Sequence, residues 1–339
     1  MKLYTDEGWI NAAGILDEID ADFIFIPGAR GIGKTYSFLA ELIDRKAKPF
    51  IYLRRRPDEA ALQANPMFSE IAKVLKPRHK AMTSEKIIGD MWVVRDADDG
   101  RDICATGALS TMAGLRGANF DEYDLMLFDE YMQEPHLRPI HEEGRALKNL
   151  YETVNRNREL ENPPRKPVKM ICLANAFDIA HDTMREFHLV EMAEQLLNSD
   201  EEIIQRGNKC LILPKHSPIS QRKKETALYK VDEDGDFSDF ALQNKFILND
   251  FSYICNKNLI EYIPRLRVGD LYLYKHKDRN EFYITKTPSK VAKQYNDNIN
   301  DLKRFQREQR HYWFAYLDGK IRFDKYNSAR IFESYYRAK

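Results

Sequence analysis

The feature that most constrains this 339-residue chain is a glycine-rich segment that directly follows a short apolar run. The run FIFI at 23–26 is typical of a buried β-strand, and GARGIGKT at 28–35 fits the pattern G-x-x-x-x-G-K-[ST]. Glycines in such a loop let backbone N–H groups turn inward around a polyphosphate, where a Cβ would obstruct them. The predicted phosphate-binding residues are Gly28, Ala29, Arg30, Gly31, Ile32, Gly33, Lys34 and Thr35.

The end of this loop carries the chemistry expected of a nucleotide site. Lys34 would reach the β- and γ-phosphates of ATP, and Thr35 would place its hydroxyl on Mg²⁺. A helix is predicted over 36–48, so its positive N-terminal end would point at the phosphates. The Arg30 side chain stays unassigned, because contact with the nucleotide, a neighbouring subunit or only solvent would each fit.

A second apolar run, at 123–128, ends in the adjacent acids Asp129 and Glu130. In a P-loop enzyme the first acid accepts hydrogen bonds from the water shell of Mg²⁺, and the second orients and deprotonates the attacking water. The acids follow the P-loop by about 95 residues, with a strand predicted at 50–53 between them. This order favours the additional-strand, catalytic-glutamate (ASCE) branch of P-loop NTPases, an α/β fold with a mostly parallel sheet flanked by helices.

A helix is predicted at 146–158, and arginines stand at its C-terminal end. Arg156 and Arg158 could satisfy the C-terminal dipole of this helix. Either could instead serve as an arginine finger, whose planar charge stabilises the transferring phosphoryl group. Both interpretations are open from the sequence.

Other polar and aromatic residues could complete the site. Asn175 ends a predicted strand and would either sense the γ-phosphate or cap the strand. The arginines at 54–56 would contact phosphate or DNA, or form ion pairs in a solvated loop. Tyr4 and Trp9 would cover the adenine ring or simply pack.

Charge is balanced over the whole chain but unevenly distributed. Lys and Arg number 53, as do Asp and Glu, yet residues 253–339 hold 19 basic against 10 acidic side chains. A basic C-terminal part indicates a polyanionic partner or a basic surface without one. Short aromatic strands at 250–254, 269–274 and 281–285, a helix at 301–316 and a hairpin at 317–323 are predicted there.

The cysteines and the hydropathy exclude other classes of protein. Cys104, Cys172, Cys210 and Cys255 are far apart and form no C-x-x-C pair, which favours reduced thiols over disulfides or a zinc site. A secretory signal pattern and runs of about 18 apolar residues are lacking, so we expect no membrane span. The predicted divisions are an ATPase domain at 1–217, a linker subdomain at 218–251 and a basic domain at 252–339.

Taken together, the motifs resemble those of the DNA-packaging ATPases of phi29-like bacteriophages, compact relatives of the large terminases. The resemblance is carried by GARGIGKT at 28–35, IYLRR at 51–55, FDE at 128–130, TVNRNRE at 153–159, ICLANA at 171–176, NKFI at 244–247 and DGKIRFD at 318–324. It covers nearly the whole chain, densely in the first domain and thinly in the second.

The resemblance implies a homo-oligomeric, pentameric ring docked on the portal of an empty prohead. There a packaging RNA helps to attach the ring, and hydrolysis of ATP with Mg²⁺ drives double-stranded DNA inward. It also implies a location in the host cytoplasm, transiently at the prohead portal vertex, and no association with a membrane.

Roles from the family fall on individual residues of this chain. The P-loop and Walker B roles fall on Lys34, Thr35, Asp129 and Glu130. Arg156 matches the finger that acts in trans on a neighbouring subunit, and Arg158 lies beside it. Arg116, before the Walker B strand, aligns with a basic residue implicated in coupling subunits.

Large terminases carry an RNase H-like nuclease after the ATPase, built on clustered carboxylates that hold two metal ions. The acids in the second domain of this chain are sparse, and the candidates considered are Asp270, Asp278, Glu281, Asp318 and Asp324. We therefore expect a vestigial, inactive nuclease fold that binds RNA, DNA or the portal. The alternatives are a true terminase with an active nuclease, and a nucleotide-binding assembly protein that does not hydrolyse ATP.

Overall fold

The computed structural model describes residues 1–45, 48–57, 71, 82–96, 99–111, 119–133, 140, 142–176, 178–223, 225–227 and 253–337. The chain divides into two compact units, Met1–Leu248 and Asn249–Lys339. Arg116 and most of the predicted linker at 218–251 lie outside the described residues.

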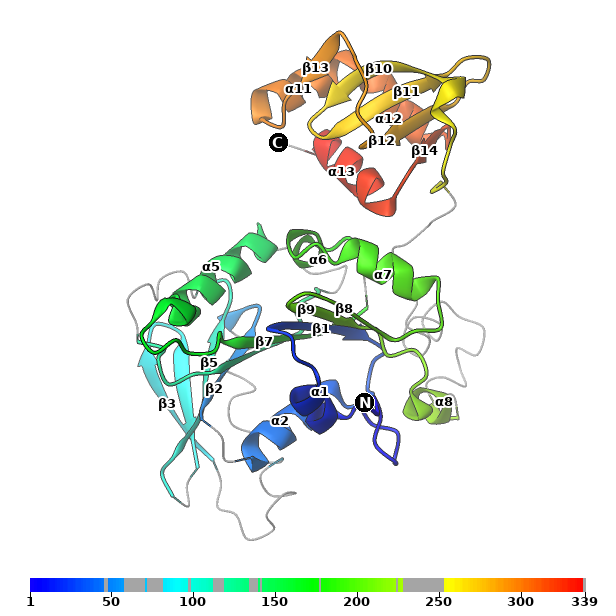
Figure 1. Cartoon of the computed structure of the whole chain (residues 1–339). Helices are drawn as coiled ribbons and strands as arrows, with labels where there is room; N and C mark the ends of the chain where they lie inside the picture. Colours follow the sequence, from blue (N-terminus) through cyan, green and yellow to red (C-terminus); the bar gives the residue numbers. More distant parts are fainter. Residues whose placement is uncertain are drawn as a thin grey trace. The chain divides into compact units, whose positions relative to one another are not determined.

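In its described part, the first unit contains a nine-stranded sheet of order β3-β4-β5-β2-β6-β7-β1-β9-β8 (Figure 1). The strands are β1 (Phe23–Gly28), β2 (Phe50–Arg54), β3 (Thr83–Ile88), β4 (Met91–Arg95), β5 (Asp102–Ala108), β6 (Leu125–Asp129), β7 (Lys169–Asn175), β8 (Ile203–Arg206) and β9 (Lys209–Ile212). The strands from β5 to β9 in this order run parallel, and antiparallel pairs close both edges. The parallel centre is buried, as its continuous apolar runs predict.

The position of β7 confirms the predicted fold class. It lies between β1, which leads into the P-loop, and β6, which ends in Asp129. The strand that separates them in the sheet is therefore β7, and not the strand at 50–53 that the chain order suggested. That strand is β2, which pairs with the far side of β6.

Helices cover both faces of this sheet (Figure 1). The described helices are α1 (Ala12–Glu18), α2 (Lys34–Asp44), α5 (Glu143–Asn155), α6 (Asp182–Glu186), α7 (Val190–Leu197) and α8 (Pro218–Lys223). On one face, α2 buries Phe38 and Leu39 in a cluster with residues of the strands. On the other face, where α5, α6 and α7 lie, Phe25 packs on Phe187 with ring centroids 5.0 Å apart.

The second unit is a small α/β unit with a five-stranded sheet of order β13-β10-β11-β12-β14. Its elements are β10 (Tyr262–Val268), β11 (Leu271–His276), β12 (Phe282–Thr285), β13 (Lys293–Tyr295), α11 (Ile299–Glu308), α12 (Arg310–Leu317), β14 (Ile321–Phe323) and α13 (Tyr326–Arg337). Tyr274, Tyr283 and Tyr312 are buried, so these aromatic residues pack in the interior. Within the described ranges of both units, no helix combines the length and apolar character needed to cross a membrane.

The predicted hairpin at 317–323 is wrong. Gly319 has a φ of +68° and terminates α12, with its N–H donating to the Tyr316 carbonyl. Residues Asp318 and Gly319 are thus a helix end, not a hairpin turn. The strand that follows, β14, pairs in parallel with β12. The single helix predicted at 301–316 is in fact two, α11 and α12.

Candidate nucleotide site

The P-loop connects β1 to α2, and its lysine folds back over it. The Lys34 ammonium donates hydrogen bonds to the carbonyl oxygens of Ala29 at 2.7 Å and Gly28 at 3.1 Å. Burial lowers the pKa of Lys34 to about 7, and the nearby Asp129 carboxylate opposes this shift. A bound phosphate would, like Asp129, favour the charged form of the Lys34 ammonium. The loop therefore holds this side chain where it can bind an anionic ligand.

Two glycines of the loop adopt left-handed backbone conformations that a side chain would strain. Gly31 has a φ of +68° and Gly33 a φ of +84°. A Cβ on Gly33 would lie 3.1 Å from the Trp9 ring, and one on Gly31 only 2.0 Å from the Lys223 ammonium nitrogen. Trp9 and Lys223 therefore lie directly against the loop. Tyr4 instead donates to the Glu202 carboxylate at 2.5 Å.

Asp129, at the end of β6, is the point where three elements meet. The Thr35 hydroxyl, from the first turn of α2, lies 3.0 Å from each of its carboxylate oxygens. From β2, the Tyr52 hydroxyl donates to it at 3.0 Å and the Arg54 guanidinium at 3.1 Å. A hydroxyl beside a carboxylate supplies the hard oxygen ligands that Mg²⁺ prefers, so Thr35 and Asp129 fit a magnesium site.

Arg54 also holds the neighbouring acid. Its Nη2 lies 2.5 Å from Glu130 Oε2, so one buried guanidinium bridges both carboxylates. The Glu130 side chain is 52% exposed, and its backbone is left-handed with a φ of +57°. Exposure of this carboxylate at the carboxyl edge of the sheet is what a water-activating group requires, but Arg54 occupies one of its oxygens.

The adjacent Arg55 is buried and joins β2 to the start of α5. It forms a bidentate ion pair with Glu143, at 2.7 and 2.8 Å, and donates to the side-chain oxygen of Gln133 at 2.9 Å. Both partners of this ion pair are almost fully buried. Arg54 and Arg55 are therefore interior residues that hold the side chains of the site in place. The alternative that they lie in a solvated loop is wrong.

The two arginines after α5 have opposite environments. Arg156 is exposed and forms the left-handed C-cap of the helix, with a φ of +46°. Arg158 is 1% exposed and donates to the Asp124 carboxylate at 2.8 Å. It also donates to the carbonyls of Phe120 at 3.0 Å and Tyr123 at 2.8 Å.

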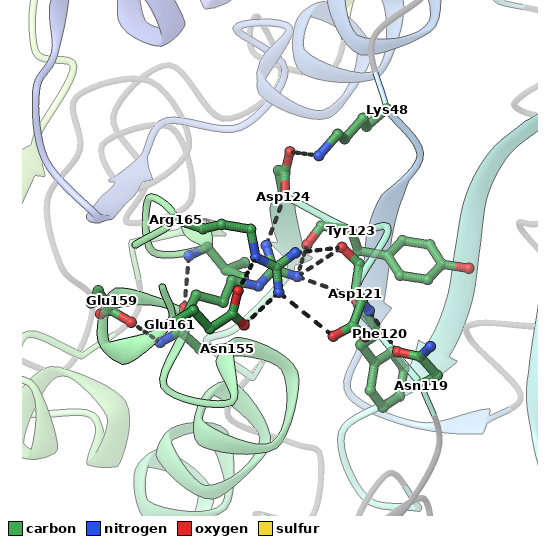
Figure 2. Close-up of polar contacts among 12 residues, drawn as sticks. Lys48, Asn119, Phe120, Asp121, Tyr123, Asp124, Asn155, Glu159, Glu161 and Arg165 are labelled. Atoms are coloured by element: carbon green, nitrogen blue, oxygen red, sulfur yellow. Dashed lines mark hydrogen bonds and ion pairs between the residues drawn. The ribbon is translucent and has the colours of Figure 1, made fainter. Parts of the chain in front are cut away.

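Figure 2 shows the loop of Phe120, Tyr123 and Asp124 beside the segment that carries Glu161 and Arg165. The Arg158 guanidinium donates its hydrogen bonds to this loop, just before β6, and so within its own subunit. Because Arg158 is buried and bonded in this way, its role is structural, and it is not placed to act on a neighbouring subunit.

Asn175 lies beside the loop, as expected. The parallel register of β1 and β7 pairs it with Gly28, the first residue of the P-loop. Its side chain is partly exposed at the same sheet edge as Asp129. The structure thus brings Asn175, the P-loop and the Asp129–Glu130 pair to one edge. Arg156 lies elsewhere.

The sequence assigned no role to Tyr52 or Lys223, and for Arg54 it did not predict the bridge to both acids. Tyr52 and Arg54 are two residues apart on β2, and side chains two apart on a strand share one face of the sheet. This spacing is the feature of the sequence that could have placed both side chains together. Lys223 is distant in sequence from the P-loop, and no pattern indicated that contact.

Three of the acids considered in the second unit have separate partners. Asp324 accepts from the Thr285 hydroxyl at 2.7 Å, Glu281 pairs with Lys257 at 3.2 Å, and Asp318 pairs with Lys320 at 2.7 Å. Across the part of the chain that the structure describes, no three His, Cys, Asp or Glu side chains are grouped so that they could hold a metal ion.

Comparisons with known proteins agree on one family. A sequence model of the podovirus DNA encapsidation protein (Gp16) matches residues 9–339. The DNA packaging protein of Bacillus phage phi29 is 28% identical over 228 residues, which cover 66% of this chain and 61% of that protein. The chain thus spans about three fifths of the length of the curated relatives it matches.

Two solved structures share the fold over almost the whole chain. The bacteriophage Phi-29 viral genome packaging motor assembly has a TM-score of 0.70 and 22% identity, covering 98% of this chain and 99% of that one. The Phi-28 gp11 DNA packaging motor has a TM-score of 0.66 and 18% identity, covering 98% and 97%.

The contrast between the two arginines after α5 predicts different effects on stability. Arg158→Ala leaves the buried carbonyls without this donor and Asp124 with only its Lys48 ion pair, so we expect a loss of about 2–4 kcal/mol in the free energy of unfolding. Arg156→Ala removes an exposed side chain, and should change it by less than about 0.5 kcal/mol. Urea unfolding of both variants measures the difference. Equal losses would contradict the assigned environments.

Proposed function

The chain belongs to the podovirus DNA encapsidation protein (Gp16) family, and on this premise we propose that it is an ATPase that drives double-stranded viral DNA into a prohead. The observation that carries the proposal is the contact between the Thr35 hydroxyl and Asp129, which joins the P-loop helix to the acidic end of β6. The phi29 relative is a DNA packaging protein, and the proteins of similar fold are packaging motors.

The residues of the site divide the chemistry of hydrolysis between them. Lys34 would leave the loop carbonyls to bind the β- and γ-phosphates, while Thr35 and Asp129 would hold Mg²⁺. When bound, Mg²⁺ neutralises charge on the phosphate oxygens. Glu130 would orient the attacking water and take its proton. Because Arg54 shares a Glu130 oxygen, this step requires their contact to open.

Two residues at the margin of the loop support nucleotide recognition. Asn175 is paired with Gly28 and would contact the γ-phosphate. The Trp9 ring, against Gly33 and partly exposed, is better placed than Tyr4 to cover the adenine. Both assignments belong to the proposal.

The position of Arg156 supports a finger that acts on another subunit. It follows α5, close to Arg158, which bonds to Asp124 at the amino end of β6. The P-loop and Asp129 lie at the opposite, carboxyl end, about 13 Å away along the five residues of β6. An exposed arginine at that edge suits the phosphate of a neighbouring subunit better than that of its own.

We extend the proposal to a homopentameric ring on the prohead portal, attached with a packaging RNA and acting on double-stranded DNA. The proteins of similar fold are named as packaging motors, which supports action within a motor, while the ring, the portal and the RNA rest on the resemblance of the motifs. The basic second unit would contact nucleic acid or the portal, since phosphate contacts are made largely by lysine and arginine. Arg116 would couple neighbouring subunits. A true nuclease gains no support from the separately paired acids of the second unit.

Glu130→Gln should bind ATP with unchanged affinity and hydrolyse it at least about 100-fold more slowly, because the amide cannot take a proton from water. Phosphate release in the presence of proheads and DNA measures the rate. If wild type releases no more phosphate than Glu130→Gln, the motor proposal fails and a non-hydrolysing assembly protein remains.

The trans action of Arg156 predicts complementation between two inactive variants. Arg156→Ala should bind ATP normally and hydrolyse it about 10³-fold or more slowly, and Lys34→Ala should bind ATP poorly. In randomly mixed rings, about a quarter of the interfaces join an intact site to an intact finger, so activity should return in part.

Arg145→Ala is the matched control for Arg156→Ala, because Arg145 lies on the same helix with a side chain 67% exposed. It should hydrolyse ATP at the wild-type rate. The absence of rescue in rings shown to contain both variants would argue against action in trans.

A further inference from the structure

The short helix α8 brings a second lysine to the P-loop. The Lys223 ammonium donates to the Arg30 carbonyl at 2.9 Å and lies against Gly31, where a Cβ would come within 2.0 Å of its nitrogen. Lys223 thus contacts the third and fourth residues of the loop. Lys34 contacts the first and second, Gly28 and Ala29. Two ammonium groups therefore hold successive parts of one loop.

Contacts with the N-terminal residues hold α8 in this position. The Ser217 hydroxyl, just before the helix, donates to the Gly8 carbonyl at 3.4 Å, and the Arg222 guanidinium donates to the Glu7 carbonyl. Gly8 also lies against the Pro218 ring, because a Cβ there would come within 2.8 Å of it. Lys223 is therefore directed at the loop by a fixed helix and is not a freely moving surface side chain.

The charges at this loop favour a polyanion. Burial and the nearby Arg30 guanidinium lower the pKa of Lys223. Lys223 and Arg30 in turn contribute to the lowered pKa of Lys34. Three cationic side chains thus repel one another around the segment whose N–H groups would surround a phosphate chain. An anion placed among them relieves this repulsion.

We infer that Lys223 is a second phosphate-binding lysine, which exchanges the Arg30 carbonyl for an oxygen of the nucleotide polyphosphate when ATP binds. Hydrogen bonds between an ammonium and a phosphate are about twice as strong as bonds to a neutral acceptor, so the exchange is favourable. The inference rests on the proposed function, because it concerns the same nucleotide site.

The place of Lys223 at the end of α8 gives this contact a further consequence. α8 is the last described helix of the first unit, which ends at Leu248. A residue at its end that binds phosphate makes the position of α8 depend on the bound nucleotide.

The test is equilibrium binding of a non-hydrolysable ATP analogue with Mg²⁺ to the full chain. Lys223→Met should bind about 10-fold more weakly than wild type, the factor expected for one lost charged hydrogen bond. Lys223→Gln keeps a polar group without the charge and should lose as much, whereas Lys223→Arg should stay within about 3-fold. Lys166→Met, which removes an exposed lysine of the same unit, should bind like wild type.

Hydrogen exchange of residues 218–223 is the second measurement, since a structural role alone would not make it depend on nucleotide. The analogue should slow exchange there in wild type and leave Lys223→Gln unchanged. Equal affinity and equal protection in wild type and Lys223→Gln would overturn the inference while the proposed function stands. If wild type binds no analogue, the proposed function and this inference both fail.

Discussion

The structure depends on the buried carboxylate of Asp129. It accepts from Thr35 on the P-loop helix and from Tyr52 and Arg54 on β2, so one side chain fixes three elements at the carboxyl edge of the sheet. A buried charge of this kind persists only when it is paired and hydrogen-bonded. The same requirement gathers the groups that could hold Mg²⁺ and positions Glu130 beside them. Stability and chemistry are therefore served here by the same contacts.

The arginines of the first unit show how burial determines the role of one residue type. Arg54 and Arg55 are interior residues that tie β2 to the two acids and to Glu143 at the start of α5. Arg158 closes the other end of α5 against the loop before β6. Arg156, two residues earlier, is exposed. Helix α5 is thus anchored at both ends by buried arginines, and this anchoring holds Arg156 at a defined place on the subunit surface.

Local patterns in the sequence were sufficient to predict the P-loop, the acidic pair, most central strands and the ASCE fold class. The patterns failed where the outcome depends on contacts between distant segments. Strand order was one case, because β7 enters the sheet between β1 and β6 and chain order does not show it. The Arg54 bridge and the Lys223 contact were others, since each joins residues far apart in sequence. Asp318 and Gly319 suggested a turn, but whether it ended a helix or joined two strands depended on where β14 paired.

The central claim is that the Thr35–Asp129 contact belongs to a site whose hydrolysis of ATP moves DNA. The most direct measurement is protection of DNA from nuclease after purified protein, proheads, genomic DNA and ATP are combined. Wild type should protect full-length DNA. Asp129→Asn keeps the shape of the side chain but loses the charge that Mg²⁺ needs, so it should protect none. Protection by Asp129→Asn equal to that by wild type would contradict the account.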